Sequence, residues 1–375
     1  MRLLSIVLFL CAPLCAQETL RVLTYNMQGM RPGSNWQVRL VFMIQSMEEL
    51  DPDIILLQEI NETMAGENNM AETVAEELGE HFGVDYHYSF AQTHIAWDEF
   101  REGVGIVSKH PVIEEGSRVL PRGTFLRKAA WNRIDSPIGM VNVFSTHLSF
   151  GSQNAAVRLQ QATEIRNYVA EIEAAYPSVA AIVGGDFNTS PDTPPITFLT
   201  NAVTDTFYYD TWAELRPEEP GHTVPAESPS DRIDYIFYRN TGDAAMDTCT
   251  IEMNQTYDGT HYTSDHLGVM TVFRHTPSET GPGNPAVPKR FGLLPNYPNP
   301  FNSNTTISYS LAKGSDVRID VWNLLGQPVV TLVNERRPGG EHHVSWSPDE
   351  LSSGMYLVRL SAESRTSARS AIYCK

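Results

Sequence analysis

Residues 52–59 read Pro-Asp-Ile-Ile-Leu-Leu-Gln-Glu. The Asp51-Pro52 pair interrupts the chain, Ile54 to Leu57 form a continuous apolar run, and the run ends on Gln58 and Glu59. A short apolar run that follows a proline break is typical of a buried strand. The stretch therefore predicts a strand with a carboxylate just beyond its apolar part.

Predicted strands and helices alternate along residues 19–275, on both sides of this stretch. Apolar runs predict further strands at Thr19–Tyr25, Val104–Ser108, Lys128–Ile134, Met140–Ser145, Val179–Val183, Asp234–Tyr238 and Leu267–Phe273. Apolar residues at helical spacing predict helices at Val38–Leu50, Met70–Leu78 and Ala155–Glu173. Many strands and few helices indicate a layered α/β protein.

Composition narrows the class of protein. The chain has 375 residues with 27 basic and 45 acidic side chains, and 41% of its residues are hydrophobic, which excludes a disordered, collagenous or disulfide-stapled chain. Outside the first twenty residues, no apolar run approaches the roughly 18 residues that a membrane-spanning helix requires. A polytopic membrane protein is therefore excluded, and the length favours two domains.

A change of composition separates the two expected domains. Residues 276–288 are rich in proline and glycine and predict a linker. Residues 17–275 carry 16 basic and 37 acidic side chains, a formal charge of −21, whereas residues 288–375 carry 10 basic and 7 acidic side chains, a charge of +3. We therefore expect one domain at 17–275 and a different one at 289–375.

Residues 1–16 have the features of a signal peptide. Arg2 supplies a positive start, Leu3 to Leu14 an apolar stretch, and Cys15-Ala16 a small-residue cleavage site. The alternative is a buried N-terminal strand, which the polar residues at 17–19 disfavour. We expect export.

The C-terminal domain is rich in short strands separated by glycine-containing turns. Strands are expected at Thr305–Leu311, Val317–Val321, Val329–Val333, His342–Trp346 and Met355–Leu360. This pattern predicts a small all-β immunoglobulin-like sandwich.

Polar residues follow nearly every apolar strand of the first domain. They are Asn26, Glu59, His147, Asp186, Asn188 and the pair Asp265-His266, which precedes a strand. Strand ends project side chains toward one rim of a sheet, so these groups can converge on one site. Their oxygen donors favour a hard cation, and the histidines add proton transfer. Together they suffice to activate water against a phosphoester.

The motifs around these residues resemble those of the endonuclease/exonuclease/phosphatase superfamily. In order along the chain they are Thr24-Tyr25-Asn26, Pro52 to Glu59, Thr146-His147-Leu148, Gly185-Asp186-Phe187-Asn188, Arg232 to Ile236 and Ser264-Asp265-His266. The resemblance covers roughly residues 19–275 and implies a four-layered α/β sandwich, with two central mixed sheets flanked by helices. It also implies a metal-dependent phosphoric ester hydrolase.

Three residues resemble the family's metal ligands. By motif, Glu59 corresponds to the principal ligand, Asn26 lies beside it, and Asp265 binds the same cation or a second one. The resemblance implies Mg²⁺ as the cofactor, with Mn²⁺ or Ca²⁺ as alternatives. Without the motifs, Asn26 would be interpreted as a turn residue and Glu59 as a solvated strand end.

Five further residues resemble the family's catalytic groups. His266 corresponds to the general base and Asp234 to the carboxylate that orients it. His147 resembles the histidine that hydrogen-bonds the scissile phosphate, and Asp186 and Asn188 the pair that positions water and a phosphate oxygen. The structural alternatives are a core histidine for His147 and an Asx turn for the Asp-Phe-Asn segment.

Weaker candidates for substrate contacts are Arg127, Arg101 and Asn132. The arginines occupy regions where family members often present a basic group to the phosphate, although a surface arginine is the alternative. The remaining histidines, His94 among them, match no motif and are interpreted as structural or surface residues.

The C-terminal domain resembles the sorting domain of the bacterial type IX secretion system. The resemblance rests on Leu294 to Asn302, Val321 to Gln327 and Gly354 to Val358. It implies contact with secretion machinery and a location on the bacterial surface or outside the cell. A plain structural or adhesive sandwich is the alternative.

The substrate is the least determined property. A charge of −21 argues against tight duplex binding but does not exclude a nuclease. The segment 151–156 is short and polar, and no exposed aromatic insertion for a lipid surface is evident. We therefore expect a secreted, monomeric, divalent-metal-dependent nuclease or phosphodiesterase. The alternatives are a sphingomyelinase-type phospholipase C acting on a lipid head group, a phosphomonoesterase acting on a small metabolite, and a catalytically inactive surface binding protein.

Overall fold

The computed structural model describes residues 18–201, 208–240 and 244–275, and, further along, residues 292–293, 296, 299, 301–311, 313–324, 326–338, 340–348, 351–362 and 365–375. The chain divides into two compact units between residues 276 and 277. The expected signal peptide (1–16) and linker (276–288) lie outside the described residues.

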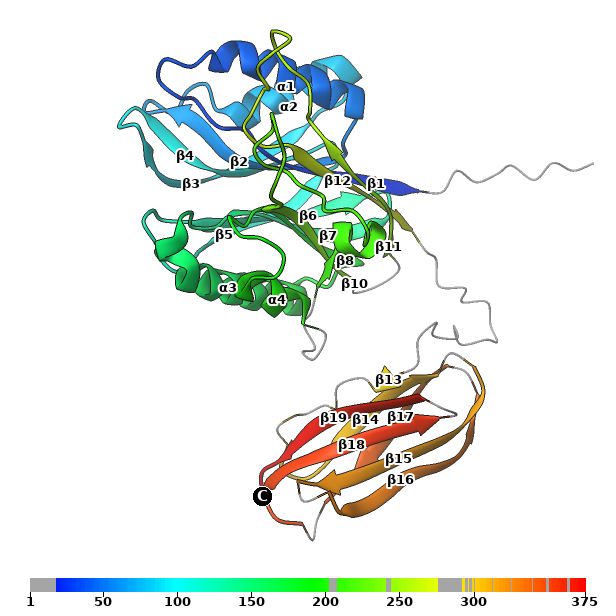
Figure 1. The fold of residues 1–375 in the computed structure, drawn as a ribbon. Helices are drawn as coiled ribbons and strands as arrows, with labels where there is room; N and C mark the ends of the chain where they lie inside the picture. The colour runs from blue at the N-terminus through cyan, green and yellow to red at the C-terminus, as the bar shows by residue number, and fades with distance from the viewer. Residues whose placement is uncertain are drawn as a thin grey trace, which may run out of the picture. The chain divides into compact units, whose positions relative to one another are not determined.

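The N-terminal unit contains two six-stranded sheets (Figure 1). The first has the order β11 (Ala244–Glu252), β12 (Gly268–His275), β1 (Thr19–Asn26), β2 (Ile54–Thr63), β4 (Phe100–Ser108) and β3 (His87–Ala96). The second has the order β5 (Val112–Val119), β6 (Lys128–Ser136), β7 (Gly139–His147), β8 (Ala180–Asp186), β10 (Asp234–Asn240) and β9 (Tyr209–Asp210). Each sheet is mixed, because β1 pairs with β2, and β7 with β8, in parallel, while their other neighbours are antiparallel.

Helices cover the outer faces of the two sheets. The first sheet packs against α1 (Trp36–Leu50) and α2 (Met70–Phe82), and the second against α3 (Ala155–Ala175) and α4 (Pro194–Thr200). Two short elements, η1 (Ser152–Asn154) and α5 (Thr211–Leu215), complete the unit. The four-layered α/β sandwich expected from the sequence is confirmed.

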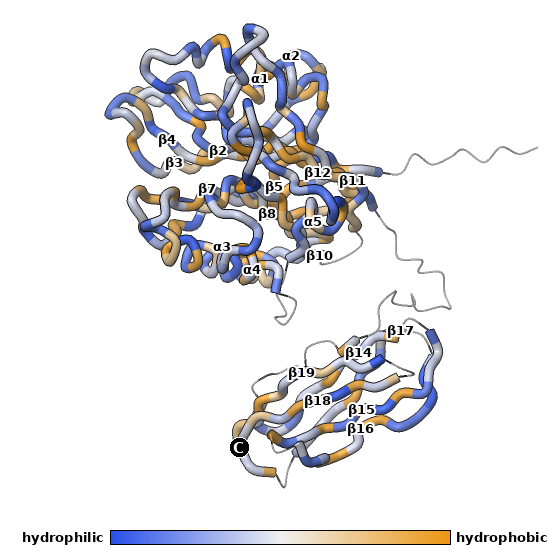
Figure 2. Tube along the Cα trace, in the orientation of Figure 1, coloured by the Kyte–Doolittle hydropathy of each residue, from blue (hydrophilic) through white to orange (hydrophobic). Residues whose placement is uncertain are grey.

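Strand β2, which contains most of the stretch 52–59, explains why the sheet is covered on both faces. Ile54 and Leu56 belong to the core between the two sheets, whereas Ile55 and Leu57 belong to the core beneath α1 and α2. Successive side chains of a strand point to opposite faces, so a continuous apolar run requires a covered sheet on both sides. Figure 2 shows hydrophobic segments where the strands of the two sheets approach each other.

Several strands were missed by the sequence analysis, and most of them end a sheet. Among the described strands, β3, β5, β9, β11 and β19 (Arg365–Tyr373) lie at the ends of their sheets, each beside one other strand. In β5, residues 113–117 are all exposed. An edge strand is held by its backbone hydrogen bonds to one neighbour, so it need not show the apolar pattern from which the central strands were predicted.

The C-terminal unit is a small all-β sandwich, as expected. One sheet contains β13 (Gly292–Leu293), β14 (Thr305–Leu311) and β17 (Gly340–Trp346); the other contains β16 (Pro328–Arg337), β15 (Ser315–Asn323), β18 (Gly354–Ala362) and β19. Buried residues from both sheets, including Ile307, Ile319 and Leu360, form one core. Among the described residues, no helix has the length and apolar character needed to cross a bilayer.

Candidate active site

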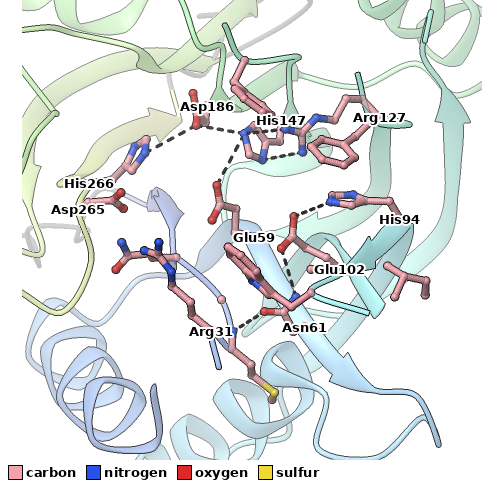
Figure 3. Close-up of a pocket in the computed structure, with 18 of the residues that line it drawn as sticks. Arg31, Glu59, Asn61, His94, Glu102, Arg127, His147, Asp186, Asp265 and His266 are labelled. Carbon is pink, nitrogen blue, oxygen red and sulfur yellow. Dashed lines mark hydrogen bonds and ion pairs between the residues drawn. The ribbon is translucent and has the colours of Figure 1, made fainter. Parts of the chain in front are cut away.

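The ends of the central strands bring the predicted polar residues to one rim of the sandwich. In the strand pairing, Asn26 lies opposite Gln58 of β2, while Asp186 lies opposite His147 on one side and Asp234 on the other. A pocket of about 460 Å³ opens at this rim. Of the predicted residues, it is lined by Glu59, Asp265, His266, Arg127, His147, Asp186 and Asn188 (Figure 3).

The close approach of β7 and β8 requires glycine next to the site. A Cβ atom on Gly185 would lie 2.0 Å from the backbone oxygen of Thr146. Glycine at this position therefore allows the neighbouring strands to place His147 and Asp186 side by side.

Asp186 is the centre of the polar network. Its Oδ2 atom accepts a hydrogen bond of 3.1 Å from Asn26 Nδ2 and lies 3.3 Å from His147 Nε2 and 3.8 Å from His266 Nε2. Its Oδ1 atom accepts from the backbone N–H of Asn188 at 2.8 Å. Burial alone would raise the pKa of Asp186, but the two imidazoles and the N–H donor hold it well below its usual range.

His266 and Asp234 form a buried pair. His266 Nδ1 lies 2.9 Å and 3.1 Å from the two carboxylate oxygens of Asp234, and Thr223 donates a further hydrogen bond of 2.6 Å to that carboxylate. Burial disfavours a charged imidazole, yet the carboxylates of Asp234, Asp186 and Asp265 outweigh burial and raise the pKa of His266. The pairing leaves Nε2 facing the pocket side, 3.5 Å from Asn26 Nδ2.

Glu59 reaches the pocket because the backbone of β2 departs from regular pairing. A β-bulge falls between Leu57 and Ile60, and Glu59 has a φ of 51° in the left-handed region. Bulges redirect side chains, and strained backbone of this kind clusters at functional sites. Burial raises the pKa of the Glu59 carboxyl group. Its Oε1 atom accepts from Asn26 Nδ2 at 3.2 Å and lies 4.0 Å from His147 Nε2.

His147 lies between Arg127 and Asp186. Arg127 is buried, and its Nη1 atom is 3.1 Å from His147 Nδ1. Arg127 Nη2 also lies 3.4 Å from His147 Nε2, so the guanidinium group faces both ring nitrogens. Asn188 Nδ2 lies 3.0 Å from Nε2 and also donates to the Leu148 carbonyl at 3.1 Å.

Two sets of side chains have the donor chemistry for a metal ion. Glu59 and Asp265 present hard oxygen donors to the pocket, and the raised pKa of Glu59 marks a carboxylate that a cation would stabilise. Asn26 lies beside Glu59, but its side-chain oxygen accepts from the Gln28 N–H and its nitrogen faces the carboxylates. In the second set, ligand atoms of Asp186, Asp234 and His266 lie within 4.8 Å of one another.

Two residues expected to contact substrate lie elsewhere. Arg101 forms an ion pair of 3.2 Å with Glu62 and does not line the pocket. Asn132 is buried on β6, where its side-chain oxygen accepts from the Ser89 hydroxyl of β3 at 2.9 Å. Asn132 lies in the strand predicted for it, whereas Arg101 was expected just before a strand and lies within β4; both side chains make other contacts.

Several pocket residues were missed by the sequence analysis. Figure 3 shows His94 and Glu102 on the opposite side of Glu59 from His266 and Asp265. His94 Nε2 lies 3.4 Å from Glu102 Oε1. Burial, with Arg127 and His147 nearby, lowers the pKa of His94 to about 4, so the ring is neutral at neutral pH. No motif marked these residues: Glu102 lies on β4, next to β2, and His94 lies on the missed strand β3, next to β4.

The pocket mouth carries exposed aromatic side chains, contrary to the expectation from the sequence. The exposed fractions are 57% for Trp97, 43% for Phe150 and 37% for Phe125. All three line the pocket. Segment 151–156 was expected to leave the mouth polar, but Phe150, which directly precedes it, lines the pocket.

A buried arginine connects the two loops that flank Glu59 and His266. Arg39 of α1 donates to the carbonyl oxygens of Gln28 at 3.0 Å, Gly29 at 2.7 Å and Thr263 at 2.7 Å. The first two belong to the loop after β1, and the third to the loop that leads into Asp265 and His266. Arg39 therefore fixes the position of both loops.

Comparison with known families agrees with this geometry. Residues 23–266 match the model of the endonuclease/exonuclease/phosphatase family. The chain belongs to this family. Its members are metal-dependent phosphoesterases and nucleases, and the N-terminal unit has their hydrolase fold. Residues 296–373 match the secretion system C-terminal sorting domain, which implies an interaction with secretion machinery.

Solved structures share the fold at low sequence identity. An endonuclease/exonuclease/phosphatase family protein from Leptotrichia buccalis C-1013-b is 19% identical, with 67% of this chain and 98% of that chain covered and a TM-score of 0.55. The human Nocturnin catalytic domain with bound sulfate anion is 18% identical, with 69% and 94% covered and a TM-score of 0.56. TDP2 from Caenorhabditis elegans is 15% identical, with 68% of this chain and 74% of that chain covered and a TM-score of 0.53. No curated protein sequence gives a significant match.

Proposed function

We propose that the N-terminal unit is a secreted, divalent-metal-dependent nuclease or phosphodiesterase in which His266 activates water. The observation that carries this proposal is the Asp234–His266 pair. The carboxylate lies 2.9 Å from Nδ1, which leaves Nε2 directed toward Asp186 and Asn26 at the pocket. In its neutral form, an imidazole held in this way accepts a proton at one defined atom, Nε2.

In the proposed reaction, water displaces the leaving oxygen at phosphorus while His266 takes up a proton. The water oxygen forms a bond to phosphorus, its proton passes to Nε2, and the bond from phosphorus to the leaving oxygen breaks. Asp234 stabilises the imidazolium that results. The leaving oxygen takes a proton from solvent water and departs as an alcohol, and His266 releases its proton to solvent before the next cycle.

Other residues hold the phosphate and the water. Arg127 and His147 offer N–H donors to the non-bridging phosphate oxygens. Asp186 accepts hydrogen bonds from its neighbours and keeps an ionised carboxylate that can orient the attacking water. Asn188 offers its side-chain amide from the same loop.

Glu59 would hold the divalent cation, with Asn26 beside it and Asp265 as a further oxygen donor. Such a cation supplies Lewis-acid polarisation of the phosphoryl group. We assign Asp186, Asp234 and His266 to proton transfer instead, because Asp234 is 1% exposed and already bonded to His266 and Thr223. Mg²⁺ is the proposed ion, with Mn²⁺ and Ca²⁺ as substitutes.

We propose that residues 1–16 and the C-terminal domain direct this activity out of the cytoplasm. We propose that the signal peptide is removed and that the sorting domain directs the chain to the bacterial surface or the medium. The family match of residues 296–373 supports this route.

The test is hydrolysis by the purified chain of single- and double-stranded DNA, RNA, sphingomyelin and small phosphate mono- and diesters. Each is assayed with Mg²⁺, Mn²⁺ or Ca²⁺ and with chelator. We expect chelator-sensitive cleavage of diesters that His266→Ala abolishes. Preference for monoesters or for sphingomyelin would replace the nuclease assignment, and silence of a folded, metal-loaded chain would favour a binding protein.

A further inference from the structure

Three ring side chains form a stacked surface beside the candidate catalytic residues. His94 stacks on Phe125 with ring centroids 4.4 Å apart and planes 19° apart, and Phe125 stacks on Phe150 at 5.9 Å and 28°. We name His94, Phe125 and Phe150 the aromatic shelf. All three line the pocket that contains Glu59 and His147.

The loops that carry the shelf are tied to each other and to α3. Asn154 donates from Nδ2 to the Phe150 carbonyl at 2.7 Å and to the Thr124 hydroxyl at 2.9 Å. Gln161 donates to the Pro121 carbonyl at 2.8 Å, and its side-chain oxygen accepts from the Ser149 N–H at 2.9 Å. Two side chains therefore each bridge the Phe125 loop and the Phe150 loop.

Arg158 strengthens the hold on the Phe150 loop. Its Nη1 atom donates to the carbonyl oxygens of Ser149 at 2.9 Å and Gly151 at 2.8 Å, on either side of Phe150. The ring of Phe150 nevertheless remains 43% exposed. A loop fixed by this many hydrogen bonds holds an exposed ring in place before any ligand arrives, which lowers the entropic cost of binding.

Trp97 extends the aromatic lining from the turn between β3 and β4. Trp97 and Asp98 have φ values of 55° and 57°, a conformation that turns of this kind normally achieve with asparagine and glycine. The guanidinium group of Arg31 lies 5.4 Å from the centroid of the Trp97 ring. A bulky residue in the left-handed region is strained, which marks the turn as a candidate for function.

The surroundings of the shelf suit a planar group with polar edges. Gln28, Asn61 and Glu102 line the same pocket and offer hydrogen-bonding atoms, whereas an acyl chain would require apolar walls throughout. Among the described pocket residues, Arg31 and Arg127 are the only arginines or lysines. Two arginine side chains, in a domain with a formal charge of −21, suit the few phosphates of a flexible single strand better than the many phosphates of a duplex.

We propose that the aromatic shelf stacks an unpaired nucleobase next to the scissile phosphate, so that the substrate is single-stranded nucleic acid. The proposal rests on the proposed phosphodiester hydrolysis and specifies its substrate class. Stacking on aromatic rings accepts any base, so the shelf confers a preference for unpaired strands and little preference for sequence.

The experiment compares two substrates that differ only in their bases. One is a short oligothymidylate, and the other has the same sugar-phosphate backbone with abasic residues. The full chain is assayed with Mg²⁺ as the parent protein, Phe150→Ala, Phe150→Tyr and Tyr176→Ala. Tyr176 is a matched control, because it is 36% exposed and does not line the pocket.

We expect Phe150→Ala to raise KM for oligothymidylate by about 5- to 100-fold, the loss of one base–ring stack. The KM for the abasic strand should not change, Phe150→Tyr should restore binding, and Tyr176→Ala should match the parent. Equal loss on both substrates would overturn the proposal, because it would show a structural role for the ring. Preferential cleavage of duplex DNA or of sphingomyelin vesicles by the parent would also overturn it.

A binding measurement separates this proposal from the proposed function. Fluorescence anisotropy of labelled oligothymidylate is recorded in chelator, where no turnover is expected. Weaker binding by Phe150→Ala than by Tyr176→Ala would support the shelf even if no ester is cleaved. Equal binding by the two variants would overturn the shelf and leave the hydrolase proposal standing.

Discussion

The two sides of the pocket are built from different parts of the fold. The side of Asp234, Asp186 and His266 lies at the ends of central strands or next to them, and Asp234 and Asp186 are 1% and 2% exposed. The side of Trp97 and Phe150 comes from a turn and a loop, and these rings are 57% and 43% exposed. Buried charges require fixed partners, whereas stacking surfaces must stay open until a ligand covers them.

This contrast separates chemistry from recognition. On the proposed catalytic side, side chains are held at defined atoms by side-chain hydrogen bonds, as Thr223 and His266, both in loops, hold Asp234 of β10. The recognition side is held through the backbone of its loops, as Asn154 holds Phe150, and its rings remain free to contact substrate. Changes on the first side should alter kcat on every substrate, and changes on the second should alter KM on some of them.

Removal of divalent cations should have the largest effect. Chelator is expected to reduce turnover of every phosphodiester to background, and added Mg²⁺, Mn²⁺ or Ca²⁺ to restore it. Glu59→Gln should shift the metal concentration for half-maximal activity upward, because the principal ligand loses its charge. Full activity in chelator, measured on the same protein sample, would contradict the metal assignment.

Replacement of His266 by alanine should be next in size. We expect kcat to fall by about 10²- to 10⁴-fold on base-bearing and abasic strands alike, because the proton acceptor is lost. Circular dichroism serves as the control for folding. A folded His266→Ala protein with near-parental activity would remove the general-base role and, with it, the comparison between the two sides.

Two buried arginines allow a sharper comparison. Arg39 holds the loops next to Glu59 and His266, and Arg158 holds the Phe150 loop. Arg39→Ala should lower kcat on both strands, whereas Arg158→Ala should raise KM for oligothymidylate alone. Each should lower the free energy of unfolding by about 2–4 kcal/mol, since hydrogen bonds to buried carbonyl groups are lost. The same kinetic change in both variants would show that the two sides are coupled.

The smallest effect concerns acid stability on the recognition side. The pKa of His94 in the folded chain is about 4, below its usual value of 6.5, so its contribution to stability is present above pH 6.5 and is lost as the pH falls toward 4. Glu102, Arg127 and His147 surround the ring and are retained in His94→Phe. This variant should therefore lose less stability between pH 7 and pH 4, by up to about 3 kcal/mol in denaturant unfolding. Parallel pH profiles would contradict a buried neutral His94.

Sequence reasoning located the catalytic side because apolar strands end there. Each of Asn26, Glu59, His147 and Asp186 follows a recognisable hydrophobic run, and the parallel pairing of β1 with β2 and of β7 with β8 aligns those ends. The motifs added the order in which the residues occur. The distances could not be predicted, since they depend on the bulge at Glu59 and on the approach of two backbones at Gly185.

The pocket side with His94 could not be predicted from the sequence, for reasons that lie in its strand pairing. His94 lies next to a second bulge in an edge strand, where the pairing shifts between Gln92 and His94, so no pattern indicated where its side chain points. For Asn132 the strand was predicted correctly, but the residue faces Ser89 between the sheets. Successive side chains alternate between faces, and a one-residue difference in that alternation decides whether a residue contacts substrate or core.

The edge position of β3 has a consequence for how this chain can diverge in evolution. The strand is bonded on one side only, and its terminal turn carries Trp97. Insertions or substitutions there disturb a single ladder of hydrogen bonds and leave the strands beneath the catalytic residues intact. Descendants of this chain can therefore exchange one substrate preference for another by mutation of the hairpin while inheriting an unaltered hydrolytic centre.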